Sequence, residues 1–151
     1  MLIRNILEES VRKFDEVKAV KWLKKKEIME RSYGELMENV VSTRKGLLAE
    51  GFEGKHIALI GTSSVEWMES YLGIITGCTT AVPLDAALPC EDLIDLLNRS
   101  DSVALFLSPK LKPYLDAFLA NCPKLQKVWM LQEEVEDAPA KVYGIGELRN
   151  A

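Results

Sequence analysis

The sequence is poor in the residue types that build disulfide frameworks and metal sites. Its 151 residues include three cysteines, Cys78, Cys90 and Cys122, and one histidine, His56. The cysteines are odd in number, widely spaced and without a Cys-x-x-Cys pair, which argues against a disulfide framework and against a zinc site. We therefore expect free, mostly buried thiols and no metal-binding residue.

Two further absences limit the classes of partner. The apolar stretch from 72 to 84 is interrupted by two glycines and Pro83, and it is shorter than the roughly 20 residues of a membrane-spanning helix. The start of the chain lacks the charged segment, apolar core and cleavage site of a secretory signal. The net charge of -4 supplies no broad positive field for nucleic acid. These features predict a cytoplasmic protein with no transmembrane segment and no nucleic-acid partner.

The first third of the chain shows helical and hairpin patterns. Apolar residues recur at helical spacing before residue 15, two short extended runs flank a lysine-rich turn, and Ser32 with Glu35 forms a capping box. The elements expected over residues 1–51 are a helix at 3–14, a hairpin with strands at 19–23 and 28–31, and a helix at 33–50 that Gly51 stops.

From residue 54 onward, short apolar runs alternate with amphipathic segments. Such alternation predicts βαβ units, and therefore an α/β fold with a largely parallel sheet flanked by helices. The strands are expected at 56–60, 79–84, 103–107 and 127–131, with helices at 64–76, from 88 onward, and at 109–121. The acidic, proline-bearing stretch at 132–140 is typical of a linker or surface loop.

The predicted helix at 64–76 carries apolar residues on two sides. One stripe consists of Val65, Met68, Leu72 and Ile75, and the other of Trp67, Tyr71 and Ile74. Burial against a sheet alone would leave the second stripe without a partner, so the helix is either sandwiched or lacks a neighbouring subdomain. We expect the second case, and therefore expect self-association through the Trp67, Tyr71 and Ile74 face.

The turn Gly61-Thr62-Ser63-Ser64 lies between a predicted strand and a predicted helix, where exposed N–H groups suit an anion. It matches neither G-x-G-x-x-G nor G-x-x-x-x-G-K-S/T. We therefore interpret it as a helix cap, with Ser63 and Glu66 forming a capping box.

Other chemistry-bearing residues show no pattern that predicts a site. His56 has no acid or nucleophile near it in the sequence. Two carboxylate pairs are conceivable, Asp85 with Asp92 and Asp95 with Asp101, but no histidine or third acid completes a metal set. The residues therefore suggest no catalytic, cofactor-binding or metal-binding assignment.

Four segments resemble motifs of the adenylate-forming enzymes. Residues 31–36 (RSYGEL) resemble the first core motif, S/T-Y-x-E-L, and residues 74–85 (IITGCTTAVPLD) resemble the second. Residues 63–67 (SSVEW) and 96–101 (LLNRSD) resemble two further stretches, and all four occur in the family's order and spacing. The opening residues 3–10 and the lysine-bearing hairpin look most like bacterial long-chain fatty acyl-CoA synthetases.

This resemblance implies an α/β scaffold that belongs to a longer ligase. Such an enzyme joins a carboxylic acid, here a fatty acid, to ATP and then passes the acyl group to CoA, using ATP, Mg²⁺ and CoA. The family's phosphate loop, Y-T/S-S-G-S/T-T-G-x-P-K, is absent from the chain, as is the C-terminal lysine that contacts the acyl phosphate. The resemblance therefore implies that residues 1–151 form one N-terminal subdomain, that this subdomain binds no cofactor and is inactive alone, and that its partner is the remainder of the synthetase.

Two alternatives stay open at this point. The chain could be a stand-alone flavodoxin-like binding or interaction module without catalysis. It could also be a natural truncated paralogue that pairs with a full-length partner.

Overall fold

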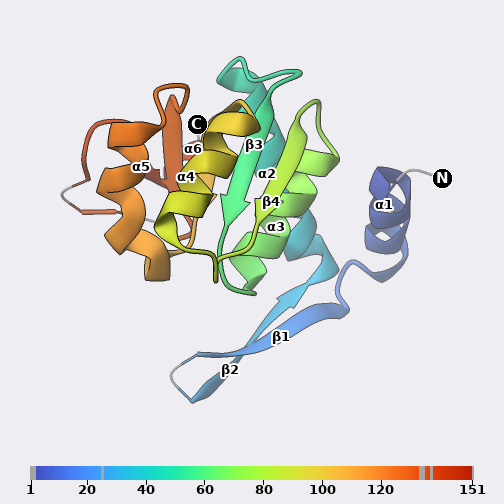
Figure 1. Cartoon of the computed structure of the whole chain (residues 1–151). Helices are drawn as coiled ribbons and strands as arrows, with labels where there is room; N and C mark the ends of the chain where they lie inside the picture. The colour runs from blue at the N-terminus through green and yellow to red at the C-terminus, as the bar shows by residue number, and fades with distance from the viewer. Residues whose placement is uncertain (1–2, 25, 133–134, 137, 151) are drawn as a thin grey trace.

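The computed structural model describes residues 3–24, 26–132, 135–136 and 138–150. Its main body is an α/β sandwich, and an N-terminal helix and hairpin project from one side of it (Figure 1). The N-terminal elements are α1 (Ile3–Phe14), β1 (Lys18–Lys24), β2 (Glu27–Ser32) and α2 (Tyr33–Ala49). The body continues with β3 (His56–Ile60), α3 (Val65–Ile75), β4 (Thr80–Leu84), α4 (Cys90–Arg99), β5 (Ser102–Leu107), η1 (Pro109–Tyr114), α5 (Leu115–Asn121), β6 (Lys127–Met130), β7 (Val142–Gly144) and α6 (Ile145–Arg149).

The body is built on a five-stranded sheet with the order β4-β3-β5-β6-β7, and all of its neighbouring strands are parallel. The central strand β5 is almost wholly apolar and buried, which is typical of a parallel sheet covered on both faces. The predicted α/β class with a largely parallel sheet is confirmed. Within the described residues, no helix is long and apolar enough to cross a membrane.

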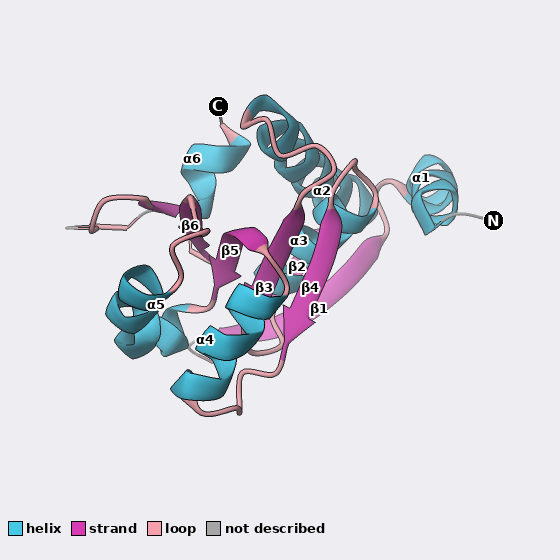
Figure 2. Ribbon diagram, turned by 45° about the horizontal axis from the view of Figure 1, so that its top comes forward, coloured by secondary structure: helices cyan, strands magenta, loops and turns pink. Residues whose placement is uncertain are grey.

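Helices cover both faces of the sheet (Figure 2). On one face, Leu105 and Leu107 of β5 pack with side chains of α4 and α5, including Leu97 and Phe118. On the other face, Phe106 packs with side chains of α2, α3 and α6. Because successive strand residues point to opposite faces, a single apolar strand supplies both cores.

Helix α3 lies between the sheet and α2. A Cβ added to Gly73 would lie 2.8 Å from the Cβ of Thr43 on α2, so glycine allows the two helices to approach closely. Ile74 is fully buried, and the rings of Trp67 and Tyr71 stack at 5.2 Å between centroids while packing on the core. Ile74 therefore belongs to the core and not to a free stripe, whereas Trp67 and Tyr71 are only partly buried. Self-association through this face stays a prediction.

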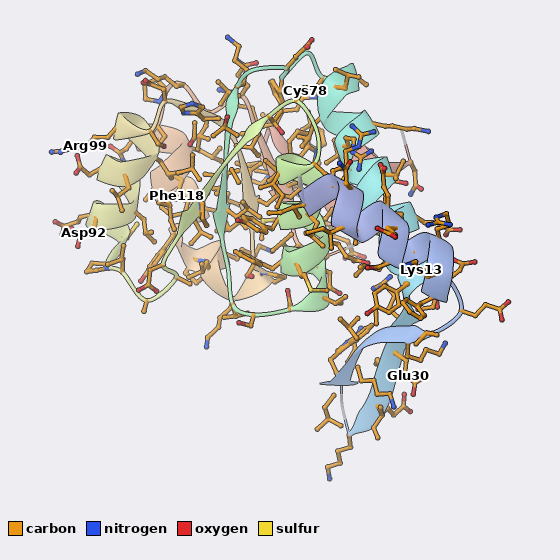
Figure 3. The ribbon with its side chains drawn as sticks, turned by 90° about the vertical axis from the view of Figure 1, so that its right-hand side faces the viewer. Lys13, Glu30, Cys78, Asp92, Arg99 and Phe118 are labelled. Atoms are coloured by element: carbon orange, nitrogen blue, oxygen red, sulfur yellow. The ribbon has the colours of Figure 1, made fainter. Side chains whose placement is uncertain are left out.

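The N-terminal segment is packed far less than the body. The antiparallel hairpin of β1 and β2 extends away from the sheet, as Figure 3 shows around the labelled Glu30. Leu23 and Ile28 face each other near its tip, and each is 71% exposed. Among the described residues from 3 to 32, Ser32 is the one that is buried. The capping box of Ser32 and Glu35 then starts α2, and Gly51, with φ of +80°, follows its end.

Three local predictions were wrong or incomplete. The helix expected at 109–121 begins as the 3₁₀ segment η1, because Pro113 has no N–H for an α-helical hydrogen bond. The cap of α3 is Ser64, not Ser63, since the Ser64 hydroxyl accepts a hydrogen bond from the Trp67 amide at 3.1 Å. The elements β7 and α6 were not anticipated.

The acidic stretch at 132–140 falls partly outside the described residues, at 133, 134 and 137. Its described residues belong to no helix or strand. Val135 packs against the core on the α4 and α5 face, so this part is anchored to the body.

Candidate functional site

A cavity of about 480 Å³ lies near the carboxyl ends of β3, β5 and β6. In parallel α/β sheets this edge is where ligands usually bind, because the loops that follow the strands converge there. The cavity is lined by Lys24, Arg31, Asn39, Thr62, Ser64, Glu66, Ser108, Pro109, Lys110, Leu131, Gln132, Ile145 and Arg149.

The lining carries more positive than negative charge. Lys24 and Arg31 come from the hairpin, Lys110 from η1 and Arg149 from α6, whereas Glu66 is the one acid among the lining residues. The chain as a whole has a formal net charge of -4. The cavity is therefore a locally positive site on an acidic protein, which suits an anionic ligand.

A buried carboxylate anchors two of these arginines. Glu69 of α3 is fully buried and accepts a hydrogen bond from Nδ2 of Asn39 at 2.8 Å. Its carboxylate also lies 3.1 Å from Nε of Arg31 and 3.6 Å from Nη1 of Arg149. Burial raises the pKa of Glu69, while Asn39 and the two arginines act in the opposite direction. Glu69 therefore links the hairpin, α2 and α6 to α3 beside the cavity.

The turn at 61–64 is fixed by a contact with the end of β5. The Thr62 amide donates a hydrogen bond to Oγ of Ser108 at 3.1 Å, and a Cβ on Gly61 would lie 2.2 Å from that oxygen. A larger residue at this position would require the Ser108 side chain to move, which would disturb its hydrogen bond with Thr62. The turn caps the helix, as the sequence suggested, but through Ser64. Thr62 and Ser64 of this turn also line the cavity.

The other residues weighed from the sequence lie apart from this cavity. His56 is at the opposite end of β3, with Nδ1 2.7 Å from the carbonyl oxygen of Ser100. Asp85 accepts a hydrogen bond from the Ala87 amide at 2.9 Å. Asp92 is exposed on the outer side of α4 (Figure 3).

The two remaining acids each have a cationic partner. Asp95 pairs with Arg99 one helical turn away at 2.9 Å, and Asp101 pairs with Lys124. Asp85 therefore holds a turn, and Asp95 and Asp101 form ion pairs with basic side chains. Over the described ranges, no group of three or more histidine, cysteine, aspartate or glutamate side chains could hold a metal ion.

The three cysteines are free, but they differ in exposure. Cys122 is buried, and burial raises the pKa of its thiol. Cys90 is partly buried, and Cys78 is exposed. The expectation of mostly buried thiols therefore holds fully for Cys122 and fails for Cys78, which lies just after the end of α3.

Sequence reasoning missed the cationic residues of the cavity and Glu69. Glu69 did leave a signal, because it follows Val65 by four positions and so lies on an apolar side of a predicted helix. The cations left none, since Lys24, Lys110 and Arg149 come from distant segments that only the tertiary fold brings together.

Solved structures of several ligases share this fold. Coronafacic acid ligase from Pectobacterium brasiliense is 19% identical, with a TM-score of 0.87 over 100% of this chain and 30% of that protein. A putative long-chain-fatty-acid CoA ligase from Rhodopseudomonas palustris is 11% identical, with a TM-score of 0.81 over 98% of this chain and 36% of that protein. The N-terminal domain of FACL13 from Mycobacterium tuberculosis is 17% identical, with a TM-score of 0.80 over 99% and 35%.

These similarities have a clear limit. At such identities they show the shared fold and nothing finer, and the chain spans only about a third of each of these proteins. No curated protein matches the sequence. A family model, however, matches residues 7–147, nearly the whole chain, and it describes AMP-binding enzymes. The chain therefore belongs to the AMP-binding enzyme family.

Proposed function

We propose that this chain is the N-terminal scaffold subdomain of an AMP-forming acyl-CoA ligase. The observation that carries the proposal is the family match over residues 7–147, in a sequence that lacks the family's phosphate loop. Residues 1–151 form one subdomain in this proposal. The sandwiched position of α3 supports it, because α2, α3 and α6 share one continuous core with the sheet.

The whole ligase would convert a carboxylic acid and ATP into an acyl-adenylate and pyrophosphate, and then transfer the acyl group to CoA. We propose a fatty acid as the acid and the cytoplasm as the compartment. The resemblance of residues 3–10 and of the hairpin to long-chain fatty acyl-CoA synthetases supports the fatty acid. ATP, Mg²⁺ and CoA would be the cofactors and cosubstrate of the whole ligase.

We propose that the chain alone is catalytically inactive and that its partner is the remainder of the ligase. Adenylyl transfer requires positioned cations and donors around the phosphates, and in the family a loop and a lysine outside this sequence supply them. The face at Trp67, Tyr71 and Ile74 is smaller than expected for self-association, because Ile74 is buried and the two aromatic side chains are partly buried against the core.

Two measurements test the proposal. The first is the reading frame downstream of the codon for Ala151, where a phosphate-loop sequence within a few tens of codons is expected. The second is carboxylate-dependent ATP–pyrophosphate exchange with a panel of fatty acids, which should be absent for this chain and present for the longer polypeptide. Exchange by the 151-residue chain, or a longer polypeptide without exchange, would contradict the proposal.

A further inference from the structure

We propose that the cavity at the carboxyl ends of β3, β5 and β6 is a binding site for a small phosphorylated anion. This site is additional to the scaffold role and does not depend on the proposed ligase activity. The cavity's volume of about 480 Å³ lies within the range of about 300 to 1,000 Å³ that is usual for small-molecule sites.

The first argument is the charge that remains in the cavity after internal pairing. The carboxylate of Glu69 already forms ion pairs with Arg31 and Arg149. Lys24 and Lys110 make no ion pair within the part of the chain that the structure describes. Lys24 and Lys110 thus line one cavity from separate segments, with Glu66 as the one acidic residue in that lining. A bound anion would be attracted to both lysines.

The second argument is that the arginine at the base of the hairpin is held in place. Arg31 is mostly buried, with 23% of its side chain exposed, and Glu69 is 3.1 Å from its Nε. This contact fixes one edge of the guanidinium group, while the same side chain lines the cavity. Such a preorganised arginine costs little entropy to use, and guanidinium groups bind phosphate oxygens well.

The third argument comes from the donors on the sheet side of the cavity. Hydroxyl groups of Thr62, Ser64 and Ser108 line it, and α3 starts there with its N-terminal end. The contact between Thr62 and Ser108 keeps the two turns in register. Hydroxyl donors and a positive helix end favour an oxyanion over a neutral ligand.

The lining also limits what else the ligand carries. Its apolar members are Pro109, Leu131 and Ile145, and it includes no aromatic ring among the described residues. A nucleotide base would therefore find no stacking partner. The class that fits best is a compact molecule with two or more phosphate charges, for which inorganic pyrophosphate is the simplest probe.

The test is calorimetric titration of the 151-residue chain with inorganic pyrophosphate at low ionic strength. We expect saturable binding at one site. Lys110→Ala and Lys24→Ala should each weaken it by about tenfold, the usual effect of losing a charge-assisted hydrogen bond. Lys112→Ala is the matched control, because Lys112 lies in the same short helix as Lys110, is exposed and does not line the cavity.

Each outcome of this titration decides the proposal. Saturable binding that Lys112→Ala preserves and that the two cavity variants weaken supports it. A titration without saturable binding heat overturns it. Equal weakening by all three lysine variants also overturns it, because this result would mean nonspecific attraction of pyrophosphate to surface lysines. An ATP titration identifies the source of the phosphates: affinity equal to that for pyrophosphate supports recognition of phosphate alone, and much tighter binding of ATP overturns the compact-ligand class.

Discussion

The N-terminal segment and the sheet body put similar apolar residues to opposite uses. In the body, the apolar residues of β3, β5 and β6 are buried on both faces. In the segment from α1 to β2, comparable residues stay at the surface, with Phe14 50% exposed and Leu23 and Ile28 each 71% exposed. An isolated two-stranded hairpin is at best marginally stable in water. The segment therefore keeps its shape through the few contacts that attach it to α2 and α3.

This difference in burial indicates which part of the chain contributes most to the free energy of folding. The cores on the two sheet faces carry the favourable free energy of folding, since buried apolar area is its main source. The hairpin depends on a polar junction, made by the Ser32 capping box and by the Arg31–Glu69 ion pair. Variants in the core, at the junction and at the hairpin tip should consequently have effects of decreasing size.

The largest effect is expected in the core of the body. Phe106→Ala should lower the free energy of unfolding by about 3 to 5 kcal/mol, because Phe106 is fully buried in the central strand and contacts Trp129. Urea unfolding followed by circular dichroism measures this change. A loss below about 1 kcal/mol would mean that the core on that face contributes little.

The next effect is expected at the junction. Glu69→Ala should cost about 3 kcal/mol, because it leaves Arg31 and Arg149 without their buried carboxylate. Proteolysis should then cut the hairpin faster than the body. Arg4→Ala is the control, since its ion pair with Glu8 is exposed and should contribute little. Equal losses for the two variants would contradict a structural role of Glu69.

The pH dependence of stability checks the same carboxylate. Burial raises the pKa of Glu69 above its ordinary value of 4.5. Between 4.5 and the folded-state pKa, the folded protein therefore keeps the Glu69 proton that the unfolded chain has released. The contribution of Glu69 should therefore fall as the pH rises from 4.5 through its folded-state pKa, and Glu69→Gln should lack this fall. Urea midpoints of both proteins from pH 4 to 8 give the difference. A wild-type advantage that grows with pH would mean that the arginines dominate over burial.

Smaller effects are expected at the helix caps. Ser32→Ala and Ser64→Ala should each cost about 1 kcal/mol, because each hydroxyl accepts a hydrogen bond from an amide of the following helix. Ser63→Ala is the matched control, since Ser63 is exposed and does not cap α3. Thermal or urea unfolding distinguishes the three. If Ser63→Ala cost more than Ser64→Ala, the assignment of the cap would be wrong.

Sequence reasoning predicted what depends on local pattern and missed what depends on tertiary approach. The parallel sheet followed from the alternation of apolar runs, and the Ser32 cap followed from its spacing to Glu35. The strand β7 was missed because three residues after an acidic loop carry little periodic signal. The burial of Ile74 was missed because it depends on α2, which lies beside α3 only in the folded chain.

The candidate site shows the same limit more strongly. The turn at 61–64 was recognised, since its glycine and hydroxyls are consecutive in the sequence. The charge of the cavity was not, because it combines Lys24, Lys110 and Arg149 from both ends and the middle of the chain. When the residues of a site are far apart in the sequence and meet only in the folded chain, no local sequence pattern reveals the site.

The smallest effect is expected at the hairpin tip, where it depends on which polypeptide is tested. In the 151-residue chain, the double variant Leu23→Ser and Ile28→Ser should change the free energy of unfolding by less than about 0.5 kcal/mol, because both side chains are largely exposed.

In a longer ligase polypeptide, the same change should be clearly destabilising if later segments cover the tip, since burying a leucine or isoleucine side chain contributes about 1.5 to 3 kcal/mol. Lys21→Ser with Glu30→Ser is the matched control, because this cross-strand ion pair lies in the same hairpin and is exposed, and neither residue is an apolar side chain. Urea unfolding of both polypeptides gives the comparison. A large loss already present in the short chain would show that the tip contributes to the stability of the body, and the contrast between the two regions would then fail.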